Sequence, residues 1–222
     1  MISQISNLRF EKKFVATGFM LTEVLATIQR HPAAFRETYS MRVVNNIYLD
    51  SPSRLDYHDH VNGVGNRSKT RIRWYGEPCG VIEHPALERK IKRGVISGKE
   101  SHRLPVFCMN GGSVEALLQA TIISAKLPEI LLFALQHRQP ALYNRYYRHY
   151  FVSGDGRFRL TVDSGLKFAD VKRNNFSLPA APTIIIELKF GLESAEDADL
   201  VTNAMPFRVD RFSKYVTGIE RR

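Results

Sequence analysis

The segment KTRIRWYG (69–76) carries a positive charge at every second position. Alternate side chains of a β-strand point to the same side of a sheet, so Lys69, Arg71 and Arg73 would share one face. The apolar residues between them would occupy the other face. Because neighbouring like charges repel each other, this segment predicts a strand whose polar face is either solvated or directed at an anionic partner.

The same division into a polar and an apolar face recurs in LRFEKKFV (8–15), RFRLTVD (157–163) and IIIELKF (184–190). Each polar face alone is typical of a solvated antiparallel sheet. Taken together, the faces are dominated by cations, and arginine is suited to bidentate contacts with phosphate. Six such strands carry eleven cations, Arg9, Lys13, Lys69, Arg71, Arg73, Lys90, Lys92, Arg145, Arg157, Arg159 and Lys189, and four carboxylates, Glu11, Glu88, Asp163 and Glu187.

The composition is that of a globular protein with an excess of positive charge. The 222 residues are 44% hydrophobic and contain 32 Lys and Arg against 22 Asp and Glu, a net charge of +10. This excess favours a polyanionic partner, such as nucleic acid, a membrane surface or a phosphate compound. The two cysteines have no metal-binding or disulfide spacing, and neither a signal peptide nor a membrane-length apolar run occurs. We therefore expect a soluble cytoplasmic protein.

Residue patterns also predict the secondary structure. Alternation and β-branched or aromatic residues predict strands at about 7–16, 43–50, 68–76, 85–93, 143–152, 157–164 and 183–190. Helical spacing of apolar residues predicts helices near 21–30, 113–124, 128–136 and 209–220. Many strands with few helices are typical of an antiparallel α+β fold. We expect one domain over residues 1–222, a closed antiparallel barrel of about eight strands with the charged faces inside and helices packed on the outside.

Two smaller patterns have competing interpretations. The segment YHDHVNG (57–63) contains two histidines that would suit a metal site, but a polar loop is the better interpretation. Loops are also expected at 174–182, in NNFSLPAAP. Asp163 is expected to pair with a neighbouring arginine and orient it, rather than to act as a base.

Short motifs that run nearly the length of the chain resemble a known family. They are RFEKKF, NNIYLDS, KTRIRWYG, LERK, LYNRYYRHYF, FRLTVD, IIELKF and RFSKY. In order and spacing they resemble the polyphosphate polymerase domain of the vacuolar transporter chaperone (VTC) family, within the triphosphate tunnel metalloenzyme (CYTH-like) superfamily. The resemblance implies an eight-stranded tunnel that binds a nucleoside triphosphate together with a divalent metal.

The resemblance also implies roles for individual residues. The catalytic residues would be Lys13, Arg71, Arg73, Lys90, Arg145, Arg159, Glu187 and Lys214. The substrate-binding residues would be Arg9, Lys69, Tyr143, Lys189 and Arg211, with Tyr143 as a hydroxyl donor. Glu187 would hold Mn²⁺ or Mg²⁺, with Glu11 and Glu88 as weaker candidates. Arg211 and Lys214 would lie on a C-terminal helix, anchored by Phe212, Tyr215 or Val216, and Ile219, at the mouth of the tunnel.

Three functions fit this resemblance. The first is synthesis of inorganic polyphosphate from the γ-phosphate of a nucleoside triphosphate such as ATP, and the second is hydrolysis of inorganic triphosphate or nucleotides. The third is a non-catalytic module that binds polyphosphate. The hydrolase branch carries Glu-x-Glu-x-Lys on its first strand, and Arg9 in place of the first glutamate favours the polymerase. The expected partners are nucleoside triphosphate and polyphosphate, with no nucleic acid. A separate membrane protein would have to supply any translocation.

Overall fold

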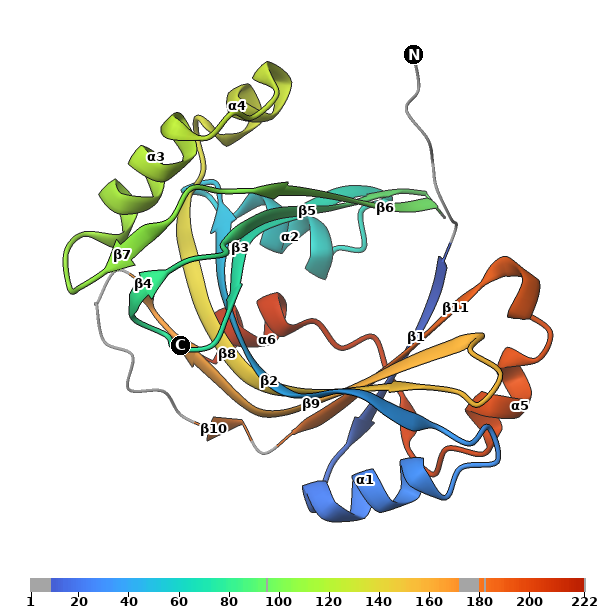
Figure 1. The fold of residues 1–222 in the computed structure, drawn as a ribbon. Coiled ribbons are helices and arrows are strands. Elements are labelled where there is room, and N and C mark those ends of the chain that lie inside the picture. The colour runs from blue at the N-terminus through green and yellow to red at the C-terminus, as the bar shows by residue number, and fades with distance from the viewer. Residues whose placement is uncertain (1–8, 95, 172–179, 182, 222) are drawn as a thin grey trace. The chain divides into compact units, whose positions relative to one another are not determined.

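The computed structural model describes residues 9–94, 96–171, 180–181 and 183–221. It is a mixed α+β structure (Figure 1). The helices are α1 (Leu21–Gln29), α2 (Leu55–Val61), α3 (Val114–Ser124), α4 (Glu129–Leu135), α5 (Ala198–Asn203) and α6 (Lys214–Glu220). The strands are β1 (Arg9–Ala16), β2 (Arg36–Asp50), β3 (Asn66–Tyr75), β4 (Gly80–Ile82), β5 (Ala86–Arg93), β6 (Ile96–Arg103), β7 (Phe107–Met109), β8 (Gln139–Val152), β9 (Phe158–Ala169), β10 (Ala180–Ala181), β11 (Ile184–Gly191) and β12 (Arg208–Val209).

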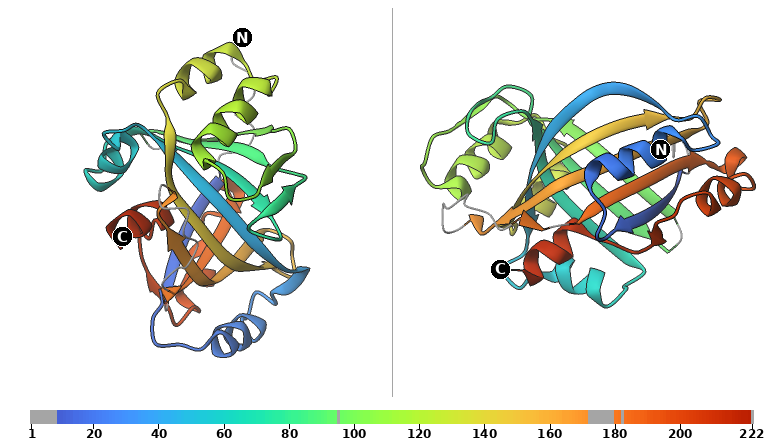
Figure 2. Two further views of the ribbon diagram at one scale, coloured as in Figure 1. Left: turned by 90° about the vertical axis from the view of Figure 1, so that its left-hand side faces the viewer. Right: turned by 90° about the horizontal axis from the view of Figure 1, so that it is seen from below.

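Most of the strands belong to one sheet. Its order is β12-β1-β11-β9-β8-β2-β3-β5-β6, with β10 paired to β9, and β4 and β7 form a second, two-stranded sheet. The pairs β1–β11, β11–β9, β2–β3, β3–β5 and β5–β6 are antiparallel. The long strands β8 and β9 lie side by side (Figures 1 and 2). In the described part of the chain, no helix has both the length and the apolar character needed to cross a membrane.

The described chain divides into two compact units. The first unit contains residues 9–42, 146–166 and 180–212, and the second contains residues 43–145, 167–171 and 213–221. Each unit has its own apolar core, so each is described separately below. The single domain expected over residues 1–222 stays a prediction.

The core of the first unit lies under the apolar faces of β1, β9 and β11. Phe14 lies opposite Ile186, which in turn lies opposite Val162, and all three side chains are fully buried. Val24 and Ile28, four residues apart on α1, belong to the same cluster. Burying one side of this sheet leaves the alternate side chains on the other side, which sets the direction of the charged residues.

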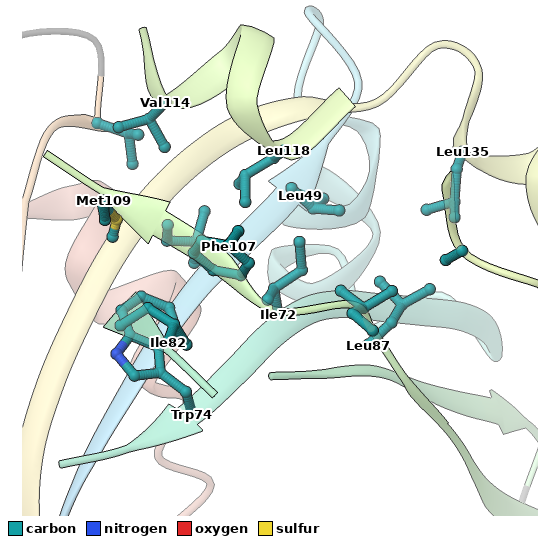
Figure 3. Packing of buried hydrophobic residues seen from close by; sticks show 14 of the residues in the cluster. Leu49, Ile72, Trp74, Ile82, Leu87, Phe107, Met109, Val114, Leu118 and Leu135 are labelled. Carbon is teal, nitrogen blue, oxygen red and sulfur yellow. The ribbon is translucent and has the colours of Figure 1, made fainter. Parts of the chain in front are cut away.

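The core of the second unit lies between β2, β3 and β5 and the α3 helix (Figure 3). Ile72 and Trp74 of the opening segment are buried here, and Trp74 packs edge-on against Phe107. Leu118 of α3 packs in the same cluster. Because Ile72 and Trp74 face this core, the cations that alternate with them on β3 face the opposite side.

The α+β class, the antiparallel sheet and most predicted elements are confirmed. The large sheet has ten strands instead of eight. The sequence patterns missed the first half of β2 and the whole of β6, both rich in polar residues, and α5. The segment with two histidines forms most of α2 instead of a loop. Of the loop expected at 174–182, only the two residues of β10 are described, and the remainder lies outside the described residues.

The C-terminal helix is shorter than predicted. α6 begins at Lys214 because the Ser213 side chain caps it, accepting a hydrogen bond from the Val216 backbone N–H at 3.3 Å. Arg211 and Phe212 therefore precede the helix, contrary to the prediction. Tyr215 and Ile219 are buried, as expected for residues that anchor it.

Candidate functional site

The first unit presents one polar face, formed by β1, β11 and β9. Lys13 lies opposite Glu187, Glu11 opposite Lys189, and Lys189 opposite Arg159. Residues directly opposite each other on antiparallel strands point to the same side of the sheet. The polar faces predicted for these three strands are therefore confirmed for these five side chains, which lie on one side. Arg157, predicted on the same face of β9, precedes the strand and pairs with Asp155 and Asp197 instead.

Glu187 is a buried carboxylate within this face. Its Oε1 atom lies 3.8 Å from Lys13 Nζ, and its Oε2 atom lies 3.6 Å from Lys189 Nζ and 3.7 Å from Arg148 Nη2. Lys13 Nζ also lies 3.1 Å from Glu11 Oε1. Two carboxylates and three cations thus share this part of the first unit.

Arg148 of β8 is a residue that sequence reasoning missed. Its guanidinium donates to both carboxylate oxygens of Asp163, with both N···O distances 2.6 Å. Burial disfavours the charged guanidinium, but the Asp163 carboxylate beside it holds the pKa of Arg148 well above its ordinary value. The prediction that Asp163 orients a neighbouring arginine is confirmed. Arg148 is therefore a buried, permanently charged donor held in one orientation.

The second unit presents its own polar face, formed by β2, β3, β5 and β6. The cations of the opening segment lie on it, as their alternation predicted. Strand pairing adds residues from the neighbouring strands, including the asparagine and tyrosine of β2 and the lysine of β6 that the sequence patterns missed. The residues on this face are Asn46, Tyr48, Lys69, Arg71, Arg73, Glu88, Lys90 and Lys99.

Glu88 gathers three of these cations. Its Oε2 atom accepts hydrogen bonds from Arg71 Nη2 at 2.6 Å and from Arg71 Nε at 2.9 Å, and it lies 3.5 Å from Arg73 Nη1. Its Oε1 atom accepts a hydrogen bond from Lys99. Burial would raise the pKa of Glu88, but Arg71, Arg73 and Lys99 outweigh it and hold the pKa well below the usual range. Both oxygens of Glu88 accept hydrogen bonds from cations of the protein itself, so Glu88 is a poorer metal ligand than the sequence suggested.

Tyr143 and Arg145 do not lie where the sequence placed them. Tyr143 is fully buried in the apolar core of the second unit, near Trp74, and its hydroxyl donates to Asn45 Oδ1 at 2.6 Å. Burial raises the pKa of this phenol. Arg145 follows two residues later on β8, so alternation directs it to the same side as Tyr143. The polar side of β8 is instead the one that carries Arg148.

The remaining predicted site residues differ in burial and in the unit to which they belong. Lys214 is buried at the start of α6 in the second unit, whereas Arg211 is exposed and belongs to the first unit. Lys69 of β3 donates a hydrogen bond to Ser213 Oγ at 2.8 Å, next to Lys214. Only the backbone of Arg9 is described, and it pairs with Gly191.

The described residues offer a divalent metal ion one or two carboxylate ligands rather than a complete coordination shell. Among the residues that the structure describes, no group of three or more His, Cys, Asp or Glu side chains is arranged to hold a metal ion. Mg²⁺ is commonly bound by one or two carboxylates, with phosphate oxygens of the substrate as further ligands. Glu187 and Glu11, which both contact Lys13, fit that pattern.

Comparison with known proteins adds a family and a fold. The VTC domain family matches residues 8–221. A protein from Pyrococcus horikoshii OT3 has a similar structure, with a TM-score of 0.56 at 13% identity, covering 97% of this chain and 100% of its own. A protein from Vibrio parahaemolyticus proposed to be an adenylate cyclase has a TM-score of 0.52 at 11% identity, covering 95% of this chain and 98% of its own.

A third similar structure comes from Hippeastrum. It is a proposed adenylyl cyclase described as having a dominant triphosphatase activity, with a TM-score of 0.52 at 12% identity, covering 96% of this chain and 97% of its own. No protein of curated function matches the sequence significantly. At these identities the structural similarities establish a shared fold.

Proposed function

The chain belongs to the VTC domain family, and we propose that it is a metal-dependent phosphotransferase that makes inorganic polyphosphate from the γ-phosphate of a nucleoside triphosphate. The observation that carries this proposal is the pair of cationic faces, one in each unit. The closed barrel expected from the sequence is part of the proposal. Nucleoside triphosphate and polyphosphate would be its partners.

The cations would bind and orient the phosphate chain. Arginine offers parallel N–H donors that match phosphate oxygens, and Arg71 and Arg148 are each held in place by a carboxylate. Donors whose orientation is fixed in advance stabilise the negative charge that spreads over the transferred phosphoryl group. Lys13, Lys189 and Arg159 would extend this contact along the first unit.

Glu187, with Glu11, would hold the metal, Mn²⁺ or Mg²⁺. When bound, such a cation neutralises charge on the phosphate oxygens and helps to align the reacting groups. Lys13 lies beside both carboxylates, so it would contact the same phosphate as the metal. Glu88, which pairs closely with Arg71, would act on the orientation of the arginines instead.

The molecule that accepts the phosphoryl group decides whether the enzyme is a polymerase or a hydrolase. Attack by the end of a phosphate chain lengthens polyphosphate, whereas attack by water releases phosphate. Arg9 replaces the first carboxylate of the hydrolase pattern, which favours the polymerase. The triphosphatase activity described for the Hippeastrum protein of the same fold keeps hydrolysis as the second candidate.

Incubation of the purified protein with ATP and Mn²⁺ tests the reaction. We expect a ladder of polyphosphate on gels, lost with a chelator and in Arg71→Ala. The matched control is Arg89→Ala, because Arg89 lies on the opposite face of β5 and pairs with Glu100. Free phosphate without a ladder would establish the triphosphatase, and tight binding of tripolyphosphate with neither product would leave a binding module.

A second comparison tests which arginine of β8, Arg148 or Arg145, contacts the phosphate chain. We expect Arg148→Lys to weaken tripolyphosphate binding by about tenfold or more, because a lysine cannot reproduce a bidentate, charge-assisted contact. Arg145→Lys should change the affinity by less than about twofold, because alternation places Arg145 on the side of β8 away from Arg148. Isothermal titration calorimetry measures both, and a larger loss in Arg145→Lys would restore the assignment made from the sequence.

A further inference from the structure

The α6 helix is fixed in the second unit by one of its faces. Tyr215, Gly218 and Ile219 are spaced to share that face, and all three are buried. The Tyr215 ring stacks on Tyr48, with ring centroids 4.9 Å apart. A Cβ atom at Gly218 would collide with Leu142 and would lie 2.6 Å from Phe168. Glycine therefore permits the close approach of α6 to Leu142 and Phe168.

Asp50, at the end of β2, holds both α6 and α2. This fully buried carboxylate accepts hydrogen bonds from the backbone N–H groups of Ser51 at 2.7 Å, Asp56 at 3.0 Å and Tyr57 at 3.1 Å. Its Oδ2 atom also accepts a hydrogen bond from the Tyr215 hydroxyl. Three of these donors belong to the turn before α2 and to α2 itself, so the bond from Tyr215 connects α6 to an already rigid element.

The residues at the start of α6 lie beside the polar face of the second unit. Ser213 caps the helix and accepts a hydrogen bond from Lys69, which shares that face with Arg71. Lys214 follows directly and is buried next to this contact. The rotation of α6 about its own axis therefore decides where the Lys214 ammonium group points.

We propose that Tyr215 and Asp50 are positioning residues, whose hydrogen bond sets the rotation of α6 and aims Lys214 at the phosphate chain. The inference rests on the proposed function only in requiring that this face binds a phosphate chain. Tyr215 acts through Lys214 and makes no contact with substrate itself. Burial, followed by the neighbouring Asp50 carboxylate, raises the pKa of Tyr215, so its hydroxyl keeps its proton for this bond.

A double-mutant cycle tests this connection. The proteins are wild type, Tyr215→Phe, Lys214→Ala and the double variant, and calorimetry measures their affinity for inorganic tripolyphosphate. Tyr215→Phe removes one hydroxyl and keeps the ring on Tyr48. We expect Lys214→Ala to weaken binding about tenfold through loss of a charge-assisted contact. Tyr215→Phe should weaken it by about threefold to tenfold, and the double variant should bind like Lys214→Ala alone, because the effects of coupled residues do not add.

Tyr57→Phe is the matched control. Tyr57 also contacts Asp50, but through its backbone N–H, which the substitution leaves in place. This variant should bind tripolyphosphate like wild type. Equal losses from Tyr215→Phe in the presence and absence of Lys214 would overturn the inference, because they would indicate a general effect on the fold. Unchanged binding in Tyr215→Phe would overturn it as well.

The same proteins separate this inference from the proposed reaction. Wild-type protein that binds tripolyphosphate but forms no product from ATP and Mn²⁺ would refute the phosphotransferase, while the cycle of affinities would still support or overturn the positioning role. Wild-type protein that does not bind tripolyphosphate would overturn both proposals.

Discussion

Replacing Glu187 with glutamine should abolish metal-dependent product formation, lowering the rate by at least about a hundredfold, as removal of a key electrostatic group does in other enzymes. Glutamine has nearly the same shape but carries no negative charge for a divalent cation. Binding of tripolyphosphate without metal should stay equal or become tighter, because the substitution removes a negative charge from among Lys13, Lys189 and Arg148. Loss of rate with intact phosphate binding separates a metal ligand from a structural residue.

The dependence of the rate on Mn²⁺ concentration measures this effect. Glu11→Gln should require more Mn²⁺ for half-maximal rate, with a smaller loss at saturation. Glu100→Gln, on an exposed side chain paired with Arg89, is the control and should behave like wild type. A Glu187→Gln protein with unchanged rate and Mn²⁺ requirement would place the metal elsewhere.

Glu88→Gln should have the largest effect on stability, a loss of about 3–5 kcal/mol at neutral pH, because it leaves the buried Arg73 and the half-buried Arg71 without their carboxylate. Arg71, Arg73 and Lys99 would then repel one another with only a neutral amide between them. Glu100→Gln, on the adjacent strand, breaks an exposed pair and should cost less than about 1 kcal/mol. Urea unfolding at pH 7 measures both free energies.

The difference in the free energy of unfolding between wild type and Glu88→Gln should decrease as the pH falls. The folded pKa of Glu88 is lowered, so the stabilisation is complete above the unfolded pKa of about 4.3 and decreases as the pH falls toward the folded value. The gap between wild type and Glu88→Gln should therefore narrow between pH 5 and pH 3. A gap that widens on acidification would contradict the charge assignment.

Alternation in the sequence was sufficient to predict the strands that have one clean apolar face. In β1, β3, β9 and β11, aromatic or aliphatic residues alternate with charges, so burial of one set determines the direction of the other. The contacts among Lys13, Glu187 and Lys189 follow from the burial of the apolar set. These strands account for most of the candidate site that sequence reasoning found.

β8 could not be assigned in the same way. In LYNRYYRHYF, both sets of alternate positions contain tyrosines and an arginine, so the pattern has no apolar side. Which side of β8 faces the apolar core depends on the packing of Tyr143 near Trp74, a contact between residues far apart in the chain. Lys99 was missed for a different reason, because ISGKESHR of β6 has one large apolar residue, Ile96, and so lacks the alternating hydrophobic signal of a strand.

The carboxylate of Glu88 has a consequence for turnover. It occupies the same guanidinium and ammonium donors that an incoming phosphate would use, so arrival of a phosphate exchanges one anionic partner for another. Such competition lowers the affinity for each phosphate unit, and it also keeps the donors satisfied whenever a unit departs. In the proposed reaction, a resident anion of this kind would weaken the binding of each phosphate unit and so ease stepwise movement of the polyphosphate chain through the site.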